Sequence, residues 1–211
     1  MRRQLSGAGA PVTAVVGPAA FDERSALVIV DVQNDFADPA GSLYVPGGEE
    51  TVAVVNQLAA ACRQEGGTIV YTQDWHPETT PHFEKDGGIW PVHCVAGTWG
   101  AELHPALRVD GPVVRKGTGA EDGYSGFSVR DVATGHDRPT GLGDLLHQHG
   151  VTRVVVVGLA LDVCVKETVL DARRLGFGVA VPLPATRAVE RVAGDGARAV
   201  AAMRAAGAIL A

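Results

Sequence analysis

Residues 153–176 have the sequence RVVVVGLALDVCVKETVLDARRLG, in which a short apolar run leads into an amphipathic segment. The run at 153–157 predicts a strand buried on both faces, as in a parallel sheet. Apolar residues then recur at helical spacing over 165–175, which predicts a helix. We expect Asp162 to cap this helix, so that Cys164 lies in its first turn. Free backbone N–H groups and the helix dipole there favour the nucleophilic thiolate of Cys164.

Strands and helices alternate along the rest of the chain. Short apolar runs predict five further strands, at 27–30, 68–72, 113–114, 179–181 and 208–210. Amphipathic spacing predicts three further helices, at 49–65, at 142–149 and, capped by Asp195, at about 197–205. Alternation of this kind predicts an α/β fold with three layers, in which helices cover both faces of a parallel sheet.

Four polar residues follow the ends of predicted strands: Asp31, Asp74, Lys116 and Cys164. The carboxyl ends of parallel strands meet at one edge of a sheet, and ligands bind beyond that edge. We therefore expect the four side chains to converge, although the pattern does not give the order of the strands.

Composition excludes several classes of partner. The chain has 211 residues, a net charge of -6 and no basic run, which argues against nucleic acid. Its three cysteines are too few and too scattered for a disulfide framework, so we expect a reducing, cytoplasmic location. The longest apolar runs have the length of strands, so no transmembrane helix or membrane partner is expected.

The N-terminal stretch is rich in glycine and proline. Two arginines after Met1 are compatible with a signal peptide, but the following residues make a poor hydrophobic region. We interpret residues 1–24 as a flexible arm, with export as the minority alternative, and residues 25–211 as a single domain.

Asp31, Lys116 and Cys164 form the first candidate constellation. A thiolate that attacks an amide needs a group that accepts a proton and later donates one to the leaving amine. Asp31 can fill both roles if its environment raises its pKa. Lys116 would stabilise both anions, and N–H groups of the turn from Ala160 to Cys164 would form an oxyanion hole. The alternative is structural, because free cysteines are mostly small core residues.

Asp74, His76, His82 and His93 form the second constellation. One carboxylate and up to three imidazoles suit zinc, iron or manganese and leave coordination positions open. The spacing matches no short metal-binding motif, so surface histidines in a loop remain the alternative.

Aromatic residues gather in two long connections, 75–110 and 117–140, and near the first strand. Loops of this length in a compact domain are usually functional or disordered. The residues are Phe36, Trp75, Trp90, Tyr124 and Phe127. They would form either the walls of a site for a flat ring or ordinary loop packing.

Several of these segments, in this order, carry a family resemblance. They are VDVQNDF at 30–36, TQDWH at 72–76, WPVHC at 90–94, KG at 116–117, YSGF at 124–127 and GLALDVCV at 158–165. Together they resemble the nicotinamidases (pyrazinamidases) of the isochorismatase-like cysteine hydrolase superfamily. The resemblance begins near Ala26 and continues to the C-terminus.

The resemblance implies a six-stranded parallel sheet in a single isochorismatase-like hydrolase domain, and hydrolysis of nicotinamide to nicotinate and ammonia. It implies that Asp31 is the general base and acid, Lys116 the electrostatic partner, and Cys164 the nucleophile that forms an acyl-thioester. It also implies a cis peptide before Ala160, whose N–H joins that of Cys164 in the oxyanion hole.

The resemblance further implies one divalent transition metal (Zn, Fe or Mn). Its ligands would be Asp74, His76 and His93, often with His82, and it would hold the pyridine nitrogen of the substrate.

Phe36, Trp90 and Tyr124 match the aromatic walls of the family's substrate site. Leu161 and Val163 depart from the family pattern on either side of the nucleophile, where many members have Thr and Tyr or His. These departures bear on substrate preference.

Two alternatives remain beside a nicotinamidase. One is a related cysteine amidohydrolase that acts on another small amide, carbamoyl or ureido compound, although such relatives generally lack the metal ligands. The other is a catalytically inactive binding module. A small-molecule amide is the expected partner, and the sequence leaves a homo-oligomer open.

Overall fold

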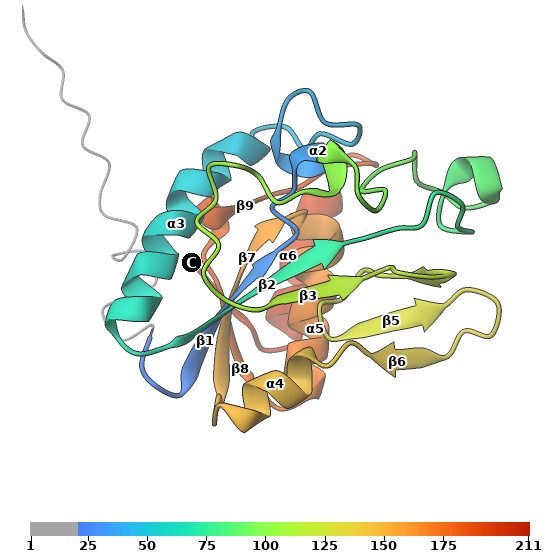
Figure 1. The fold of residues 1–211 in the computed structure, drawn as a ribbon. Coiled ribbons are helices and arrows are strands. Elements are labelled where there is room, and N and C mark those ends of the chain that lie inside the picture. The colour runs from blue at the N-terminus through green and yellow to red at the C-terminus, as the bar shows by residue number, and fades with distance from the viewer. Residues whose placement is uncertain (1–20) are drawn as a thin grey trace, which may run out of the picture.

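A parallel β-sheet forms the centre of the fold in this computed structural model, which describes residues 21–211 (Figure 1). Its strands are β1 (Ser25–Val30), β2 (Thr68–Asp74), β3 (Val113–Lys116), β7 (Arg153–Leu159), β8 (Gly178–Val181), β9 (Thr186–Arg187) and β10 (Ile209–Leu210). The order is β10-β8-β7-β1-β2-β3, with β9 paired to the end of β7, and every pair is parallel. The six predicted strands are confirmed. Strand β9 was not predicted, because two residues are too few to show an apolar run.

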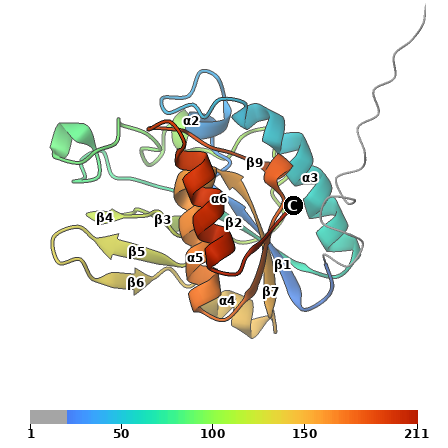
Figure 2. The same ribbon diagram turned by 180° about the vertical axis from the view of Figure 1, so that it is seen from behind.

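Helices cover both faces of this sheet. They are α2 (Asn34–Ala37), α3 (Gly48–Gln64), α4 (Leu142–Gln148), α5 (Lys166–Arg174) and α6 (Asp195–Ala205), with short 3₁₀ turns at Glu84–Asp86, Trp99–Ala101 and Leu183–Ala185. Figure 2 shows α5 and α6 packed across one face, while α3 lies against the other. The predicted three-layer α/β fold is confirmed.

Alternate residues of each central strand enter different cores, as the two-residue period of a strand requires. In β1, Leu27 and Ile29 pack with α3, whereas Val28 and Val30 pack with the helices on the opposite face. A strand between two covered faces needs apolar residues at every position, which explains the unbroken runs in the sequence.

A second, antiparallel sheet lies beside the first and consists of β4 (Glu121–Asp122), β5 (Ser128–Asp131) and β6 (Asp137–Pro139). It falls within the connection predicted at 117–140. Its strands are short and polar, so they show no hydrophobic period from which they could have been predicted.

Both predicted aspartate caps are wrong. A π-helical turn, Leu161–Val165, opens the segment that continues as α5, and its N-cap is Ala160. The carboxylate of Asp162 instead accepts the N–H groups of Val189 and Glu190. The N-cap of α6 is Gly194, and Asp195 is the first residue of that helix.

Most of the predicted N-terminal arm, residues 1–24, lies outside the described residues, and the division into arm and domain stays a prediction. Among residues 21–211, no helix has the length and apolar character needed to cross a membrane. The cytoplasmic location also stays a prediction.

Gly158 allows β7 and β1 to approach each other closely. It has φ +106°, and a Cβ built there would lie 2.0 Å from the carbonyl oxygen of Val30. Gly158→Ala should therefore lower the free energy of unfolding by clearly more than about 1 kcal/mol. Gly176→Ala is the matched control, because Gly176 has φ +88° but no heavy atom within 4 Å of the added Cβ. Urea unfolding of both variants makes the comparison, and equal losses would contradict a steric role for Gly158.

Candidate active site

The order of the strands brings the four predicted residues together. Strands β7, β1, β2 and β3 are neighbours in the sheet. Cys164 follows β7, Asp31 follows β1, and Asp74 and Lys116 are the last residues of β2 and β3. From β1 the chain builds outward through β2 and β3, and the strands after β7 extend in the opposite direction. The reversal between β1 and β7 is the place where open α/β sheets bind ligands.

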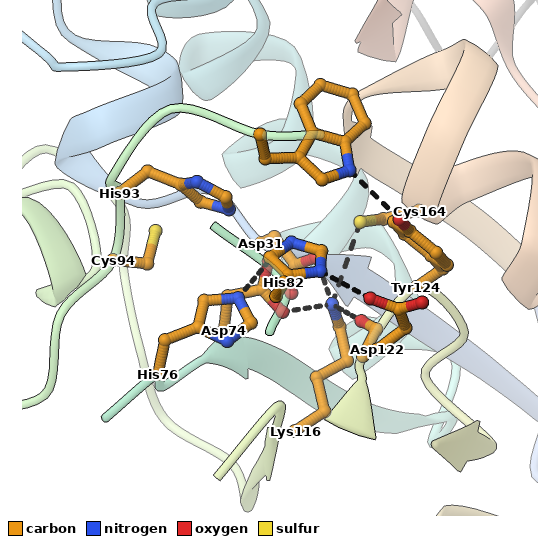
Figure 3. Close-up of polar contacts among 12 residues, drawn as sticks. Asp31, Asp74, His76, His82, His93, Cys94, Lys116, Asp122, Tyr124 and Cys164 are labelled. Carbon is orange, nitrogen blue, oxygen red and sulfur yellow. Dashed lines mark hydrogen bonds and ion pairs between the residues drawn. The ribbon is translucent and has the colours of Figure 1, made fainter. Parts of the chain in front are cut away.

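The ammonium of Lys116 lies at the centre of this group (Figure 3). Its Nζ lies 2.8 Å from Oδ2 of Asp31, 2.5 Å from Oδ1 of Asp74 and 3.6 Å from Sγ of Cys164. It also donates to the carbonyl oxygen of Gly123. One buried cation therefore joins both carboxylates to the thiol.

The two carboxylates keep Lys116 charged in spite of its burial. Burial alone would lower its pKa, but Asp31 and Asp74 outweigh that effect and raise the pKa well above its usual value. Burial likewise opposes ionisation of Asp74, yet Lys116 and the neighbouring histidines hold its pKa well below the usual range. Asp74 is therefore an anion at neutral pH.

The pKa of Asp31 shifts in the opposite direction from that of Asp74. Burial raises the pKa of Asp31 from 3.8 to about 6, against the opposing effect of Lys116, and the anion of Asp74 adds to the rise. Thr72 donates a hydrogen bond of 2.6 Å to Oδ1 of Asp31. A carboxylate whose pKa lies near the working pH can both accept and return a proton.

Cys164 is buried and lines the pocket described below, and the expectation of a resting thiolate is wrong. Burial raises the pKa of its thiol well above the usual value, Lys116 opposes the rise, and the anions of Asp31 and Asp74 reinforce it. One oxygen of each carboxylate lies within 4.8 Å of Sγ. The resting pair is therefore a thiol and a carboxylate, so attack requires Asp31 to take the proton.

Three histidines from the long connection gather beside Asp74. One ring nitrogen from each of His76, His82 and His93 lies within 4.8 Å of the others, and all three residues are buried. Oδ2 of Asp74 lies 3.7 Å from Nε2 of His76, so the carboxylate borders this group, and the burial of the three rings excludes the alternative of surface histidines.

The ring environments match those of metal ligands. His93 Nδ1 lies 2.7 Å from the carbonyl oxygen of Pro91, and burial lowers the pKa of His93 to about 4, which leaves a neutral ring with one free nitrogen. Both ring nitrogens of His76 are buried without a hydrogen-bond partner among residues 21–211. A Cβ on Gly117 would lie 2.4 Å from that ring. These donors therefore fit a divalent transition metal.

A pocket opens over this cluster. The predicted walls Phe36, Trp90 and Tyr124 line it, and the indole N–H of Trp90 donates to the hydroxyl of Tyr124 at 2.9 Å. The other two aromatic residues of that group do not line the pocket. Trp75 stacks on Arg115, and Phe127 packs against Phe177 in the core. The pocket has further apolar walls: Leu43, Val45 and Val189, which were not predicted, and Val163, one of the two departures noted beside the nucleophile.

Further polar residues support the cluster. The side chain of Gln33 bonds both the N–H and the carbonyl of Asp74, each at 2.8 Å, and Asp122 contacts His82. Gln33 and Thr72 lie inside motifs quoted above, next to residues with assigned roles. Asp122 shows no signal in the sequence, because only the second sheet places it at the site.

The nucleophile turn has the backbone form that the resemblance implied. The peptide bond between Leu159 and Ala160 is cis, and Ala160 and Cys164 both line the pocket. The oxyanion hole itself stays a prediction.

Comparison with known proteins assigns the family. Residues 25–211 match the family described as the isochorismatase domain. The chain belongs to this family. It is 39% identical to the nicotinamidase of Escherichia coli, over 88% of this chain and 93% of that protein.

Solved structures agree with this assignment. The crystal structure of PnC1 from L. infantum in complex with nicotinate superposes with a TM-score of 0.82 at 38% identity, over 90% of this chain and 94% of that one. The pyrazinamidase of Pyrococcus horikoshii in complex with zinc gives 0.79 at 36% identity, over 89% and 98%. The resemblance to nicotinamidases seen in the sequence is thus confirmed.

Cys164→Ala should lower amide turnover by more than about 10³-fold while the protein stays folded, because it removes the only thiol in the pocket and leaves a slightly smaller side chain. Cys62→Ala is the control, since Cys62 is an enclosed core thiol that does not line the pocket. Ammonia release and thermal unfolding of both variants test this. A Cys164→Ala protein as active as its parent would exclude covalent catalysis.

The pH profile should report Asp31. The thiol proton can move only to an ionised Asp31, and this pKa is raised to about 6, so kcat/KM should be constant above about pH 7. Below about pH 6 it should fall roughly tenfold per unit as Asp31 becomes protonated. Asp31→Asn should abolish turnover at every pH. An acid limb near pH 4, or an active Asp31→Asn enzyme, would contradict the role of base.

Proposed function

We propose that the chain converts nicotinamide to nicotinate and ammonia, and also hydrolyses pyrazinamide, through an acyl-thioester on Cys164. It is an amidohydrolase of the isochorismatase family that acts on a carboxamide. The observation that carries the proposal is the contact of one buried ammonium with a thiol and two carboxylates, next to three enclosed imidazoles.

A divalent transition metal belongs to the proposal. Asp74, His76, His82 and His93 would hold it. The zinc complex of the related pyrazinamidase supports a divalent metal in this family. When bound, the ion would supply a Lewis-acid contact for the ring nitrogen of the substrate. Carboxylate and imidazole ligands suit Zn, Fe and Mn alike, so the choice among them stays open.

Acylation begins with the proton of the Cys164 thiol. Asp31 accepts it while Sγ forms a bond to the amide carbon, and the carbonyl oxygen gains a negative charge. Backbone N–H groups of Ala160 and Cys164 are the proposed donors to that oxyanion. Protonated Asp31 then gives the proton to the amide nitrogen, the C–N bond breaks, and ammonia leaves an acyl-thioester.

Deacylation reverses the proton path. Asp31 takes a proton from a water molecule while the oxygen of that water attacks the thioester carbon, and the C–S bond then breaks. The proton on Asp31 returns to sulfur, which restores the thiol, and the carboxylic acid product releases its own proton to solvent and leaves as the carboxylate. Lys116 stays protonated throughout and offsets negative charge on Asp31 or Cys164, whichever carries it.

Ammonia release from nicotinamide, with elemental analysis of the same preparation, tests the proposal. We expect turnover together with about one equivalent of a transition metal. Ammonia released from a small carbamoyl or ureido compound but not from nicotinamide would favour the related amidohydrolase. No release from any of these amides would favour a binding module.

The ring nitrogen should decide substrate choice. In one pose it must face the imidazoles while the carboxamide faces Cys164 between the aromatic walls. Moving or deleting the nitrogen breaks that match, and a shift of about 1 Å can cost on the order of a hundredfold in rate. Nicotinamide and pyrazinamide should therefore have a much higher kcat/KM than benzamide and picolinamide. Equal values for benzamide and nicotinamide would contradict recognition of the ring nitrogen.

A further inference from the structure

Asp122 makes a side-chain contact that the proposed mechanism does not use. Its Oδ1 lies 2.5 Å from Nδ1 of His82, and both residues lie at the site in Figure 3. The side chain of His82 is 3% exposed and that of Asp122 is 25% exposed. The pair therefore joins an enclosed imidazole that lines the pocket to a partly exposed carboxylate outside its lining.

The second sheet holds Asp122 in place. Asp122 is the last residue of β4 and pairs with Arg130 of β5. The two residues that follow it also contact the site. The carbonyl oxygen of Gly123 accepts a hydrogen bond from the ammonium of Lys116, and the hydroxyl of Tyr124 accepts one from the indole N–H of Trp90. Three successive residues of one strand end thus contact the histidine cluster, the catalytic lysine and the aromatic wall.

Gly123 shows how tightly this segment is fitted. A Cβ there would lie 2.7 Å from the backbone nitrogen of Gly117, and Gly117 in turn packs against the ring of His76. Asp122 therefore has little freedom to move away from His82.

We propose that Asp122 is a positioning residue for the metal site, which it serves by fixing the orientation and tautomer of His82. The carboxylate holds the proton on Nδ1, so Nε2 is the nitrogen left for a metal ion. A carboxylate behind a ligating imidazole also makes that imidazole a more basic ligand.

The three imidazoles differ in this respect. His93 has a neutral backbone carbonyl behind it, and His76 has no hydrogen-bond partner among the described residues. Of the three, His82 alone has a carboxylate on the nitrogen that faces away from the cluster; the carboxylate near His76 is Asp74, itself a proposed ligand. Asp122 thus assigns His82 the role of a direct ligand and removes the ambiguity between its two ring nitrogens.

Zinc affinity measures this role without reference to turnover. Metal-free protein is titrated with zinc against a chromophoric chelator, for the parent chain, Asp122→Ala, Asp122→Asn and His82→Ala. We expect Asp122→Ala to weaken zinc binding by about 10- to 100-fold and to approach His82→Ala. The zinc affinity of Asp122→Asn should lie between those of the parent chain and Asp122→Ala. An amide oxygen can accept a hydrogen bond from Nδ1–H of His82, but it lacks the negative charge.

Asp137→Asn is the matched control. Asp137 lies in β6 of the same small sheet, is exposed, and pairs with Arg130 rather than with the site. It should leave zinc affinity unchanged. The unfolding temperature of each metal-free variant separates positioning from stability, because a positioning role predicts weaker zinc binding in Asp122→Asn without a lower unfolding temperature.

The inference rests on the metal site of the proposed function, and the outcomes distinguish the two. A parent chain that binds zinc, with Asp122 variants that bind it within about twofold of the parent, would overturn the inference alone. Equal weakening by Asp137→Asn, or weakening that only follows lost stability, would overturn it as well. A parent chain that binds no zinc would overturn both the inference and the proposed metal site.

Discussion

The buried ammonium of Lys116 is the interaction on which the site depends. An isolated charge in a protein interior is strongly unfavourable, so Lys116 is tolerated only because Asp31 and Asp74 surround it. Pairing in the sheet places the ends of β1, β2 and β3 side by side, and the Lys116 ammonium joins the two carboxylates there to Cys164. Removing either carboxylate would leave Lys116 with a single anionic partner, and it would also remove a functional group.

One consequence is that the two aspartates beside Lys116 differ in their pKa values. Asp74 lies next to Lys116 and near the histidines, and it stays ionised. Asp31 is enclosed beside that anion, and its pKa rises to about 6. The first is therefore suited to hold a cation and the second to move a proton. Divergent environments of paired carboxylates are a common route to separate catalytic roles.

The long connection at 75–110 is ordered mainly by buried polar side chains, because it has no long helix or strand of its own. Asp35 accepts the N–H groups of Ser42 and Cys94, and a Cβ on Gly100 would collide with its carboxylate. Gln33 attaches the end of β2 to the segment around Ala101. These contacts explain why loops rich in glycine, proline and histidine form a defined pocket, as functional loops on a rigid sheet usually do.

The sequence by itself determined the six main strands, the covered parallel sheet and the residues at the carboxyl ends of its strands, because apolar periodicity and strand polarity are local properties. It also indicated the nucleophile turn and the histidines. Tertiary structure alone decided the strand order, the small sheet that presents Asp122, and the protonation of Cys164. The thiolate expected from helix position was wrong, since burial and two nearby anions outweigh a helix dipole and Lys116. These effects depend on which side chains meet in space, and no local pattern encodes that.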